Sequence, residues 1–318
     1  MKNIKSIIIT VIYILQAGIL WAELDTKVGT TGASFLKIGV GARALALGES
    51  FVAVADDVNS LYWNPAGISQ IKTNELMLMH NVWFIDTSYE YIGFVYPMQD
   101  RAIGISAGYL NLGTIEGKDS NDNVISSFKA YDMYVGLSYS ERIEVGLEEE
   151  GRLLVGGTVK VIQEKIEETT ATGFGVDIGG LFWLSEELSV GMIVQNIGTS
   201  MKYIEEKNSL PMNIKVGGAY RLLEDKELLV SVDVSKPLDN KMIAGTGAEY
   251  KLYDKSWGEM MIIFRGGYKY QIGGNDDIGL TGVSGGLGFV YSLIEVDYAF
   301  VPYGRLGNSH RVALVVKF

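Results

Sequence analysis

The chain has 318 residues, no cysteine, and a net charge of −11 from 27 basic and 38 acidic residues. Without cysteine it forms neither disulfides nor thiolate metal sites, and two histidines, His80 and His310, are too few for an all-protein zinc site. The acidic balance argues against nucleic-acid binding, because phosphate contacts need clustered Lys and Arg. We therefore expect no metal, no cofactor and no nucleic-acid partner.

The first 22 residues predict a secretory signal peptide. Lys2 and Lys5 precede a mostly apolar stretch over residues 7–19, and Ala22 is followed by the acidic Glu23. We place cleavage after Ala22. The alternative is an uncleaved membrane anchor, but the apolar stretch is shorter than the ~20 residues that a membrane-spanning helix needs.

Residues 41–69 differ from everything that follows them. Within them, residues 51–55 form an apolar run, FVAVA, with no polar alternation. Such a run suits an environment that is buried on both faces. Since the later chain reads as a series of short alternating strands, we interpret residues 23–74 as a plug and residues 75–318 as the barrel that contains it.

A rigid corner is expected after the apolar run. Asp56 and Asp57 offer N-cap side chains to a short helical turn that reaches Tyr62. In the stretch that follows, Asn-Pro-Ala-Gly at 64–67, the proline biases the asparagine before it away from the α region. The candidate plug and ligand residues are therefore Arg43, Phe51, Asp56, Asp57, Asn64, Pro65 and Gly67.

Arg43 is the only basic residue in 41–69. Its guanidinium can pair with Glu49 or with a lumenal carboxylate such as Asp177, or it can contact the anionic head group of a ligand. Pairing is the favoured alternative. Asp56 and Asp57 present a similar choice between helix capping, which we favour, and contacts to an ion or a ligand.

Fourteen strands are expected after the plug. The number is even, as single-chain bacterial outer-membrane barrels require, and most strands reach the ~10 residues that such barrels need. The alternation is clearest near the end, where Val296 faces one side while Glu295 and Asp297 face the other, and the last strand ends on the aromatic Phe318. The expected strands lie near 75–84, 88–97, 102–111, 129–139, 152–163, 173–184, 187–196, 211–221, 226–235, 242–252, 259–271, 280–290, 293–301 and 310–318.

A soluble β-sandwich would alternate in the same way. Against it, the polar faces often carry small residues, such as Gly104, Ser106 and Gly108, which suit a lumen or a curved wall. The predicted fold class is therefore all-β: a transmembrane antiparallel β-barrel of about 14 strands with an N-terminal lumenal plug, located in a Gram-negative type of outer membrane.

Three blocks within residues 41–69, GARALALG, FVAVADD and LYWNPAGIS, resemble the N-terminal signature of the PorV/PorQ-like outer-membrane proteins, which are relatives of the FadL fatty-acid channels. Residues 298–302 and 306–310 resemble the closing strands of that family. The resemblance implies one of two functions. The first is a channel that passes or holds an apolar small molecule under control of the plug. The second is a non-enzymatic scaffold of a type IX-like secretion pathway that holds exported proteins at the cell surface.

The connections between strands bear on this choice. Counted from a periplasmic N-terminus, the long connections 112–128 and 197–210 fall outside the cell. The other outer connections are short, and the longest connection, 112–128, is polar. A scaffold would need large outer loops with aromatic contact residues, so this pattern favours transport. The expected partners are outer-membrane lipid, a hydrophobic ligand, exported proteins and the outer-membrane assembly machinery.

A hydrolase is a further alternative. Residues 282–286 satisfy the G-x-S-x-G pattern around Ser284, and Asp297 and His310 follow in the hydrolase order. A nucleophile elbow needs a strand-to-helix turn, whereas the residues after Ser284 read as a continuing strand. We therefore expect no enzymatic activity.

Overall fold

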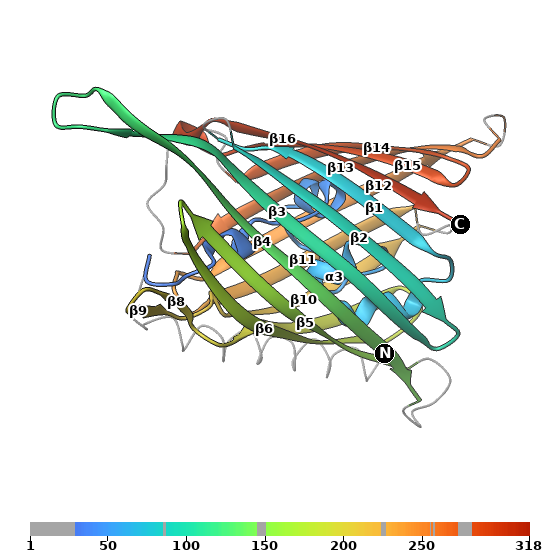
Figure 1. The fold of residues 1–318 in the computed structure, drawn as a ribbon. Helices are drawn as coiled ribbons and strands as arrows, with labels where there is room; N and C mark the ends of the chain where they lie inside the picture. The colour runs from blue at the N-terminus through green and yellow to red at the C-terminus, as the bar shows by residue number, and fades with distance from the viewer. Residues whose placement is uncertain are drawn as a thin grey trace.

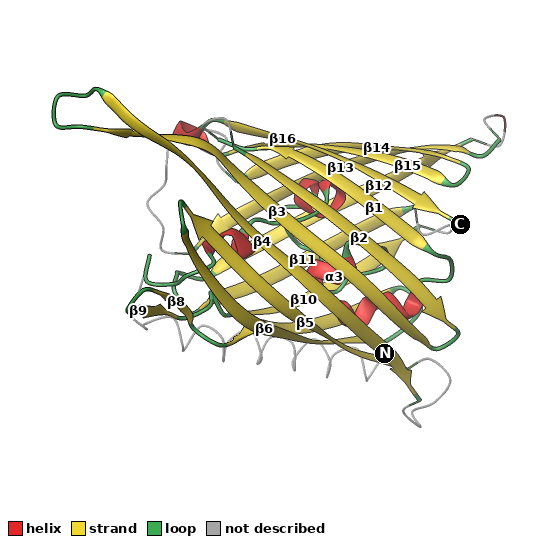
Figure 2. Ribbon diagram, viewed as in Figure 1, coloured by secondary structure: helices red, strands yellow, loops and turns green. Residues whose placement is uncertain are grey.

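The computed structural model describes residues 29–84, 87–144, 151–223, 227–254, 256, 258–272 and 282–318. The predicted signal peptide, residues 1–22, lies outside the described residues. Fourteen of the described strands close into one antiparallel barrel, in which β16 returns to pair with β1 (Figures 1 and 2). This confirms the predicted fold class of the wall.

Each of the fourteen predicted strands has one counterpart in the barrel. The strands are β1 Glu75–Val82, β2 Ser88–Met98, β3 Arg101–Lys118, β4 Val124–Ile143, β5 Arg152–Ile166, β6 Thr169–Trp183, β7 Leu188–Gly198, β10 Asn213–Leu222, β11 Leu228–Pro237, β12 Ile243–Tyr253, β13 Met260–Gln271, β14 Val283–Tyr291, β15 Ile294–Pro302 and β16 Asn308–Lys317. A short helix, η4 Gly304–Leu306, separates the last two. We call the end where β1 begins and β16 ends the base, and the other end the opposite rim.

The expected loop over 112–128 is wrong. β3 and β4 continue through most of this stretch and pair with each other up to Lys118 and Val124. β2 pairs with β3 only as far as Asn111, and β4 pairs with β5 only as far as Ala130. The paired ends therefore form a hairpin that projects beyond the opposite rim (Figure 1). Polar and glycine residues led to the loop assignment, but the cross-strand ladder holds them extended.

The second long connection, 197–210, also contains strands. They are β8 Met201–Tyr203 and β9 Glu206–Asn208, which pair in a small separate sheet. Thr31 forms a parallel bridge with Ser209 just after them. The start of the described chain is therefore held at the opposite rim.

The wall carries apolar side chains outward and polar or small ones inward. On β15, Val296 is 41 % exposed whereas its neighbour Asp297 is 1 % exposed. On β11, Val232 points outward and Asp233 inward in the same way. The inward and outward assignments therefore agree with the alternation that the sequence predicts, and an outward apolar band is what a barrel in lipid requires.

Residues 29–74, the N-terminal segment, run inside the barrel (Figure 2). The segment starts at the opposite rim, where Gly32 N donates to Ser209 O at 3.0 Å, and reaches the base, where Asn74 and Phe318 exchange two backbone hydrogen bonds of 3.0 Å. None of the helices in the described part of the chain is long and apolar enough to cross a membrane. The segment's helices are η1 Ser34–Lys37, α2 Ala42–Ala46, α3 Ser60–Trp63 and η2 Pro65–Gln70.

Glycines in the wall allow the N-terminal segment to approach the strands closely. A Cβ atom on Gly267 of β13 would lie 2.1 Å from Gly48 N, and one on Gly247 of β12 would lie 2.5 Å from Leu47 O. Both distances are far below van der Waals contact, so no larger residue fits without moving the backbone of the segment. The small residues that face the lumen therefore make room for the N-terminal segment as well as allowing the wall to curve.

Candidate functional site

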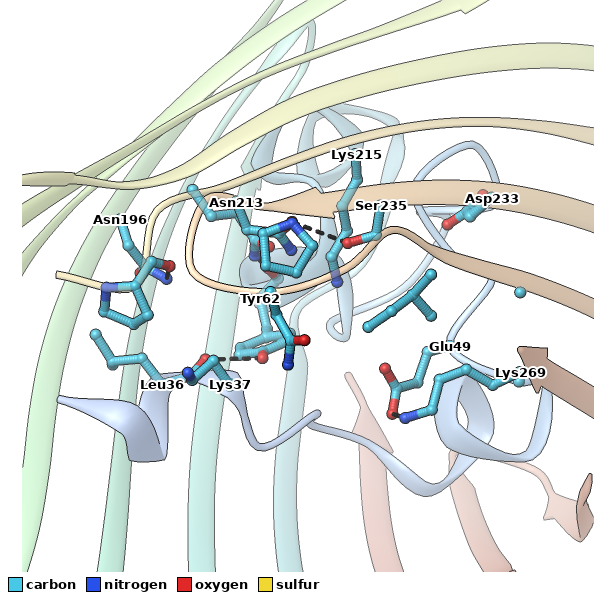
Figure 3. Close-up of a pocket in the computed structure, with 17 residues that line it drawn as sticks. Leu36, Lys37, Glu49, Tyr62, Asn196, Asn213, Lys215, Asp233, Ser235 and Lys269 are labelled. Carbon is cyan, nitrogen blue, oxygen red and sulfur yellow. Dashed lines mark hydrogen bonds and ion pairs between the residues drawn. The ribbon is translucent and has the colours of Figure 1, made fainter. Parts of the chain in front are cut away.

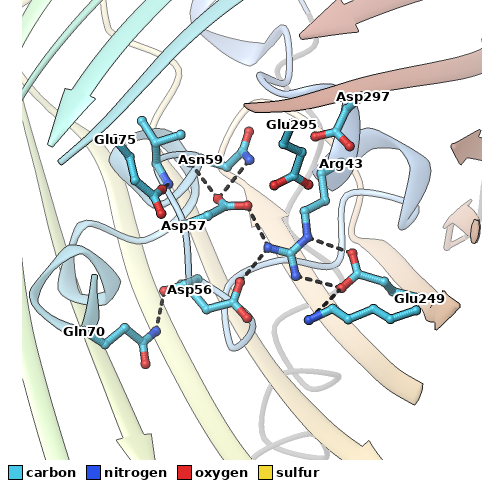
Figure 4. A network of polar contacts seen from close by, with 12 residues as sticks. Arg43, Asp56, Asp57, Asn59, Gln70, Glu75, Glu249, Glu295 and Asp297 are labelled. Atoms are coloured by element: carbon cyan, nitrogen blue, oxygen red, sulfur yellow. Dashed lines mark hydrogen bonds and ion pairs between the residues drawn. The ribbon is translucent and has the colours of Figure 1, made fainter. Parts of the chain in front are cut away.

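Arg43, on α2, is the centre of a buried ion network (Figure 4). Its Nε and Nη2 atoms donate to the two carboxylate oxygens of Glu249 on β12, at 2.7 and 2.9 Å. Its Nη1 atom donates to Asp56 Oδ1 and to Asp57 Oδ2, both at 2.7 Å. One guanidinium therefore joins two parts of the N-terminal segment to the wall.

A second arginine completes the network from the wall. Arg265 on β13 donates from Nε to Glu249 Oε2 at 2.7 Å, from Nη2 to Glu295 Oε1 at 3.2 Å, and from Nη1 to Asp297. Glu249 thus lies between two guanidinium groups. Because several carboxylates share these two cations, the removal of either arginine would leave buried negative charge without a partner.

Arg43 pairs with a lumenal carboxylate, Glu249, but with neither of the two residues named from the sequence. Glu49 instead accepts from Lys269 Nζ at 2.5 Å, and Asp177 pairs with Lys160 Nζ at 2.8 Å. Asp177 lies on β6 and Glu49 at the turn after α2, so each has a lysine nearer than Arg43. Which lumenal carboxylate meets Arg43 depends on the register of the whole barrel, and a single strand pattern does not contain that information.

Of the two expected helix caps, Asp57 makes a capping type of contact and Asp56 does not. Asp57 Oδ1 accepts the backbone N–H of Asn59 at 2.8 Å, which is a capping type of contact, but its other oxygen binds Arg43. Asp56 binds Arg43 and Arg221 through its two carboxylate oxygens. Burial by itself would raise the pKa of Asp56, but Arg43 and then Arg221 outweigh it and hold that pKa well below its usual range. The capping prediction for Asp56 is therefore wrong.

The Asn64-Pro65 corner adopts the extended backbone that the proline predicts, with φ −165° and ψ 99° at Asn64. Asn64 Nδ2 donates to Val52 O at 2.8 Å and to Gly180 O of the wall at 3.1 Å, and its Oδ1 accepts from Ala66 N at 3.2 Å. A Cβ atom on Gly67 would lie 2.0 Å from Ala55 O. The corner is therefore fixed against both the apolar run and the wall.

The apolar run 51–55 is fully buried, as its composition predicts. Its first two N–H groups, at Phe51 and Val52, donate to Asp233 Oδ2 of β11 at 2.8 and 2.9 Å. The run is therefore held by the wall through its backbone, since its side chains offer no polar group.

A cavity of about 210 Å³ lies near the opposite rim, between the N-terminal segment and the wall (Figure 3). The seven residues singled out from the sequence lie outside its lining. Its charged lining residues are Lys37, Glu49, Lys215, Asp233 and Lys269. Sequence reasoning missed the lysines of β10 and β13, although both fall at inward positions of strands whose adjacent residues are apolar or aromatic.

The sequence matches the family model of the type IX secretion system protein PorV over residues 22–242. The chain belongs to the PorV family. No curated protein was found to match it. Family membership and the fourteen-strand barrel together support residence in the outer membrane.

Solved structures show which fold this PorV-family chain shares. The Pseudomonas putida toluene transporter TodX has a TM-score of 0.58 at 11% identity, with 88% of this chain and 99% of that chain covered. A Pseudomonas aeruginosa FadL homologue has a TM-score of 0.57 at 12% identity, covering 93% and 99%. The CymD monoaromatic hydrocarbon channel has 0.57 at 10%, covering 88% and 97%. At these identities the likeness concerns the fold alone.

The hydrolase pattern is not assembled in this PorV-family barrel. Ser284 on β14 donates to Ala46 O at 3.2 Å, so its hydroxyl serves the N-terminal segment. His310 lies on the outer face and contacts the hydroxyl of Tyr298 at 2.8 Å. Asp297 binds Arg265 inside the lumen. The family and the fold are those of transport channels and secretion components rather than of enzymes.

Proposed function

We propose that this protein is a non-enzymatic component of a type IX secretion pathway, a closed outer-membrane barrel that contacts exported proteins at its outer rim. The observation that carries the proposal is the occupied lumen. The apolar run 51–55 is fully buried there, and Arg43 is anchored by the ion network. A route through the barrel would require that network to break, whereas a protein that works at its rim needs no such route. In this proposal residues 1–22 are removed and residues 23–74 act as a permanent plug.

The β3–β4 hairpin supports a role at the rim. Most connections at the base are short, for example between β14 and β15, although eight residues separate β4 from β5, and short turns are typical of the periplasmic side. The hairpin then faces the cell exterior. It exposes Ile115, Val124 and Ile125, of which the last is 69 % exposed. Apolar side chains on a projecting element favour contact with another protein. The polar loop expected from the sequence favoured transport, whereas this exposed hairpin favours the secretion role.

A second candidate is a channel for a small apolar molecule, as the name of the toluene transporter suggests. The cavity of about 210 Å³ favours it, because the lumen then contains space beside the plug. The charged lining of the cavity suits an apolar cargo poorly. We therefore rank transport second.

The test is deletion of the gene in its own host, followed by quantitation of exported proteins at the cell surface. The full chain should restore them, and so should the control Ile204→Asp, whose residue is exposed on the β8–β9 turn at the same rim. Ile125→Asp should restore fewer of them. If the deletion leaves the surface proteins unchanged and abolishes uptake of radiolabelled toluene, the channel function replaces the proposal.

A further inference from the structure

Lys215 on β10 is a buried cation that makes no direct ion pair with a described carboxylate. The residue is 8 % exposed, and its ammonium group points into the cavity near the opposite rim (Figure 3). Among the described residues, no carboxylate oxygen lies within 4.0 Å of its Nζ atom, which is 4.2 Å from the centre of the Trp63 ring. The ring face attracts the charge but accepts no strong hydrogen bond. Burying an ammonium group without hydrogen-bond acceptors costs free energy. An anion bound in the cavity would lower this cost.

Two of the three lysines that line the cavity are already paired with carboxylates. Glu49 accepts from Lys269 at 2.5 Å. Asp233 uses Oδ2 for the backbone N–H groups of Phe51 and Val52, whereas its Oδ1 has no hydrogen-bond partner among the described residues. At the mouth, Lys37 pairs with Asp239 at 2.6 Å. Among the charged residues that line the cavity, Lys215 is therefore the cation without an ion pair.

Asn213 supplies a second donor beside this charge. It lies two residues before Lys215, so the two side chains share the inward face of β10. Its Oδ1 atom accepts from Ser235 Oγ at 2.8 Å, which directs its amide nitrogen, a donor only, away from that contact. An ammonium and an amide N–H on one face form a suitable cradle for a carboxylate.

The rest of the cavity provides apolar surface for a small body. Its volume of about 210 Å³ leaves room for one small organic molecule. The apolar lining comes from the N-terminal segment, from the residues just before β10, from the end of β11 and from the start of β12: Leu36, Pro211, Pro237 and Ile243.

We propose that this cavity binds a small organic acid, with its carboxylate on Lys215 and Asn213 and its body against the apolar lining. The site is separate from the ion network around Arg43, and it does not depend on the secretion role. It makes the barrel responsive to small carboxylates at its outer rim.

The test is calorimetric titration of the purified full-length barrel, in mild detergent, with benzoate and with the neutral benzyl alcohol. Benzoate should bind at one saturable site and benzyl alcohol should not. Lys215→Met keeps the apolar stem and removes the charge, so it should weaken benzoate binding by about tenfold to a hundredfold. The matched control is Lys202→Met, at an exposed lysine on β8 of the same rim, and it should bind like the wild type.

Three outcomes overturn the proposal: no saturable benzoate binding, equal binding of benzyl alcohol, or wild-type affinity in Lys215→Met. If Lys215→Met does not fold, as judged by heat-modifiable migration on a gel, Lys215→Arg and Asn213→Leu replace it. The arginine variant should retain binding and the leucine variant should lose most of it. Either opposite result also overturns the proposal, and neither bears on the surface display of exported proteins.

Discussion

Arg43 and Glu249 are joined by two hydrogen bonds, of 2.7 and 2.9 Å, across a separation of 206 residues in the chain. The first residue belongs to the N-terminal segment and the second to β12 of the wall. A paired contact of this geometry is stronger and more directional than a single one. Arg265 donates to the same carboxylate at 2.7 Å, which fixes the orientation of Glu249. This contact therefore sets where the segment lies in the lumen.

Arg43→Met should loosen the N-terminal segment without unfolding the wall. The change leaves Glu249, Asp56 and Asp57 with less positive charge, and breaking such a buried pair costs about 3 to 5 kcal/mol. We expect higher ion conductance across a planar bilayer and proteolysis within residues 41–69. Arg101→Met is the matched control, because it removes an exposed pair with Glu141, worth about 1 kcal/mol or less. Unchanged conductance in Arg43→Met would mean that the network does not anchor the segment.

Substitution by valine should have a large effect at one of two adjacent glycines of β13 and almost none at the other. Gly267 faces the segment, where a Cβ would lie 2.1 Å from Gly48 N, whereas a Cβ on Gly266 meets no heavy atom within 4 Å. Gly267→Val should displace the segment and raise conductance or lower the yield of assembled barrel. Gly266→Val should change stability by about 0.5 kcal/mol or less. Equal behaviour of the two variants in conductance and heat-modifiable migration would contradict the close packing of segment and wall.

The wall was predictable from the sequence because strand periodicity is local. Outward Val296 and inward Asp297 follow from a repeat of two residues, and an unalternated run such as 51–55 indicates burial on both faces. The hairpin over 112–128 was not predicted, since its strands are stabilised by pairing with each other rather than by a buried face. Its glycine and polar residues are typical of a loop, and only the pairing between β3 and β4 shows that they are extended.

The candidate site was predictable only in part, because its contacts join distant parts of the chain. The corner at Asn64 follows from the proline that succeeds it. The choice of Glu249 as partner of Arg43 depends on the stagger of the closed barrel. Lys215 was missed because one inward lysine has no local signature that separates a structural ion pair from a ligand contact.

Acidification should release the N-terminal segment only at low pH. Burial would raise the pKa of Asp56, but Arg43 and Arg221 outweigh it and lower that pKa below its unfolded value of about 3.9. A lowered pKa stabilises the folded state above the unfolded value, and this stabilisation is lost as the pH falls through the folded pKa. The contribution of Asp56 should therefore stay constant from about pH 7 to 5, and conductance that depends on this contact should rise only below about pH 4.

The control for this pH dependence is Asp56→Asn. It removes the carboxylate at every pH, so the variant should be leakier at pH 7 and should change less on acidification than the wild type. A wild-type transition near neutral pH would show that a group other than Asp56 controls the segment.

Arginine at position 296 should be far less tolerated than at an exposed rim position. Val296 lies on the outward face of β15, where a charge near mid-membrane costs about 2 to 4 kcal/mol. We expect Val296→Arg to lower the amount of folded barrel in the outer membrane. Ile204→Arg, at the exposed β8–β9 turn, should have no such effect. For orientation, a water-soluble maleimide that labels Val296→Cys faster than Asp297→Cys would reverse the assignment of the two faces.

Asn64→Leu should release the corner that fixes the apolar run in the lumen. The asparagine donates to Val52 O and to Gly180 O, and it accepts from Ala66 N. Leucine has a similar size but satisfies none of these three buried backbone groups, and each group left unpaired costs about 1 to 3 kcal/mol. We expect higher conductance and faster uptake of a small dye, with unchanged heat-modifiable migration, because the ladder of the wall is continuous without the corner.

Pro65→Gly tests the same corner through its backbone. The glycine increases the conformational freedom of the chain at the corner when the N-terminal segment is released from the lumen, whereas the side-chain contacts of Asn64 remain. It should therefore open the barrel less than Asn64→Leu. Deletion of residues 41–69 gives the upper limit of conductance, against which both variants are read. If this deletion leaves conductance and dye uptake as they are in the wild type, the N-terminal segment does not close the lumen, and the plug in the proposed function is wrong.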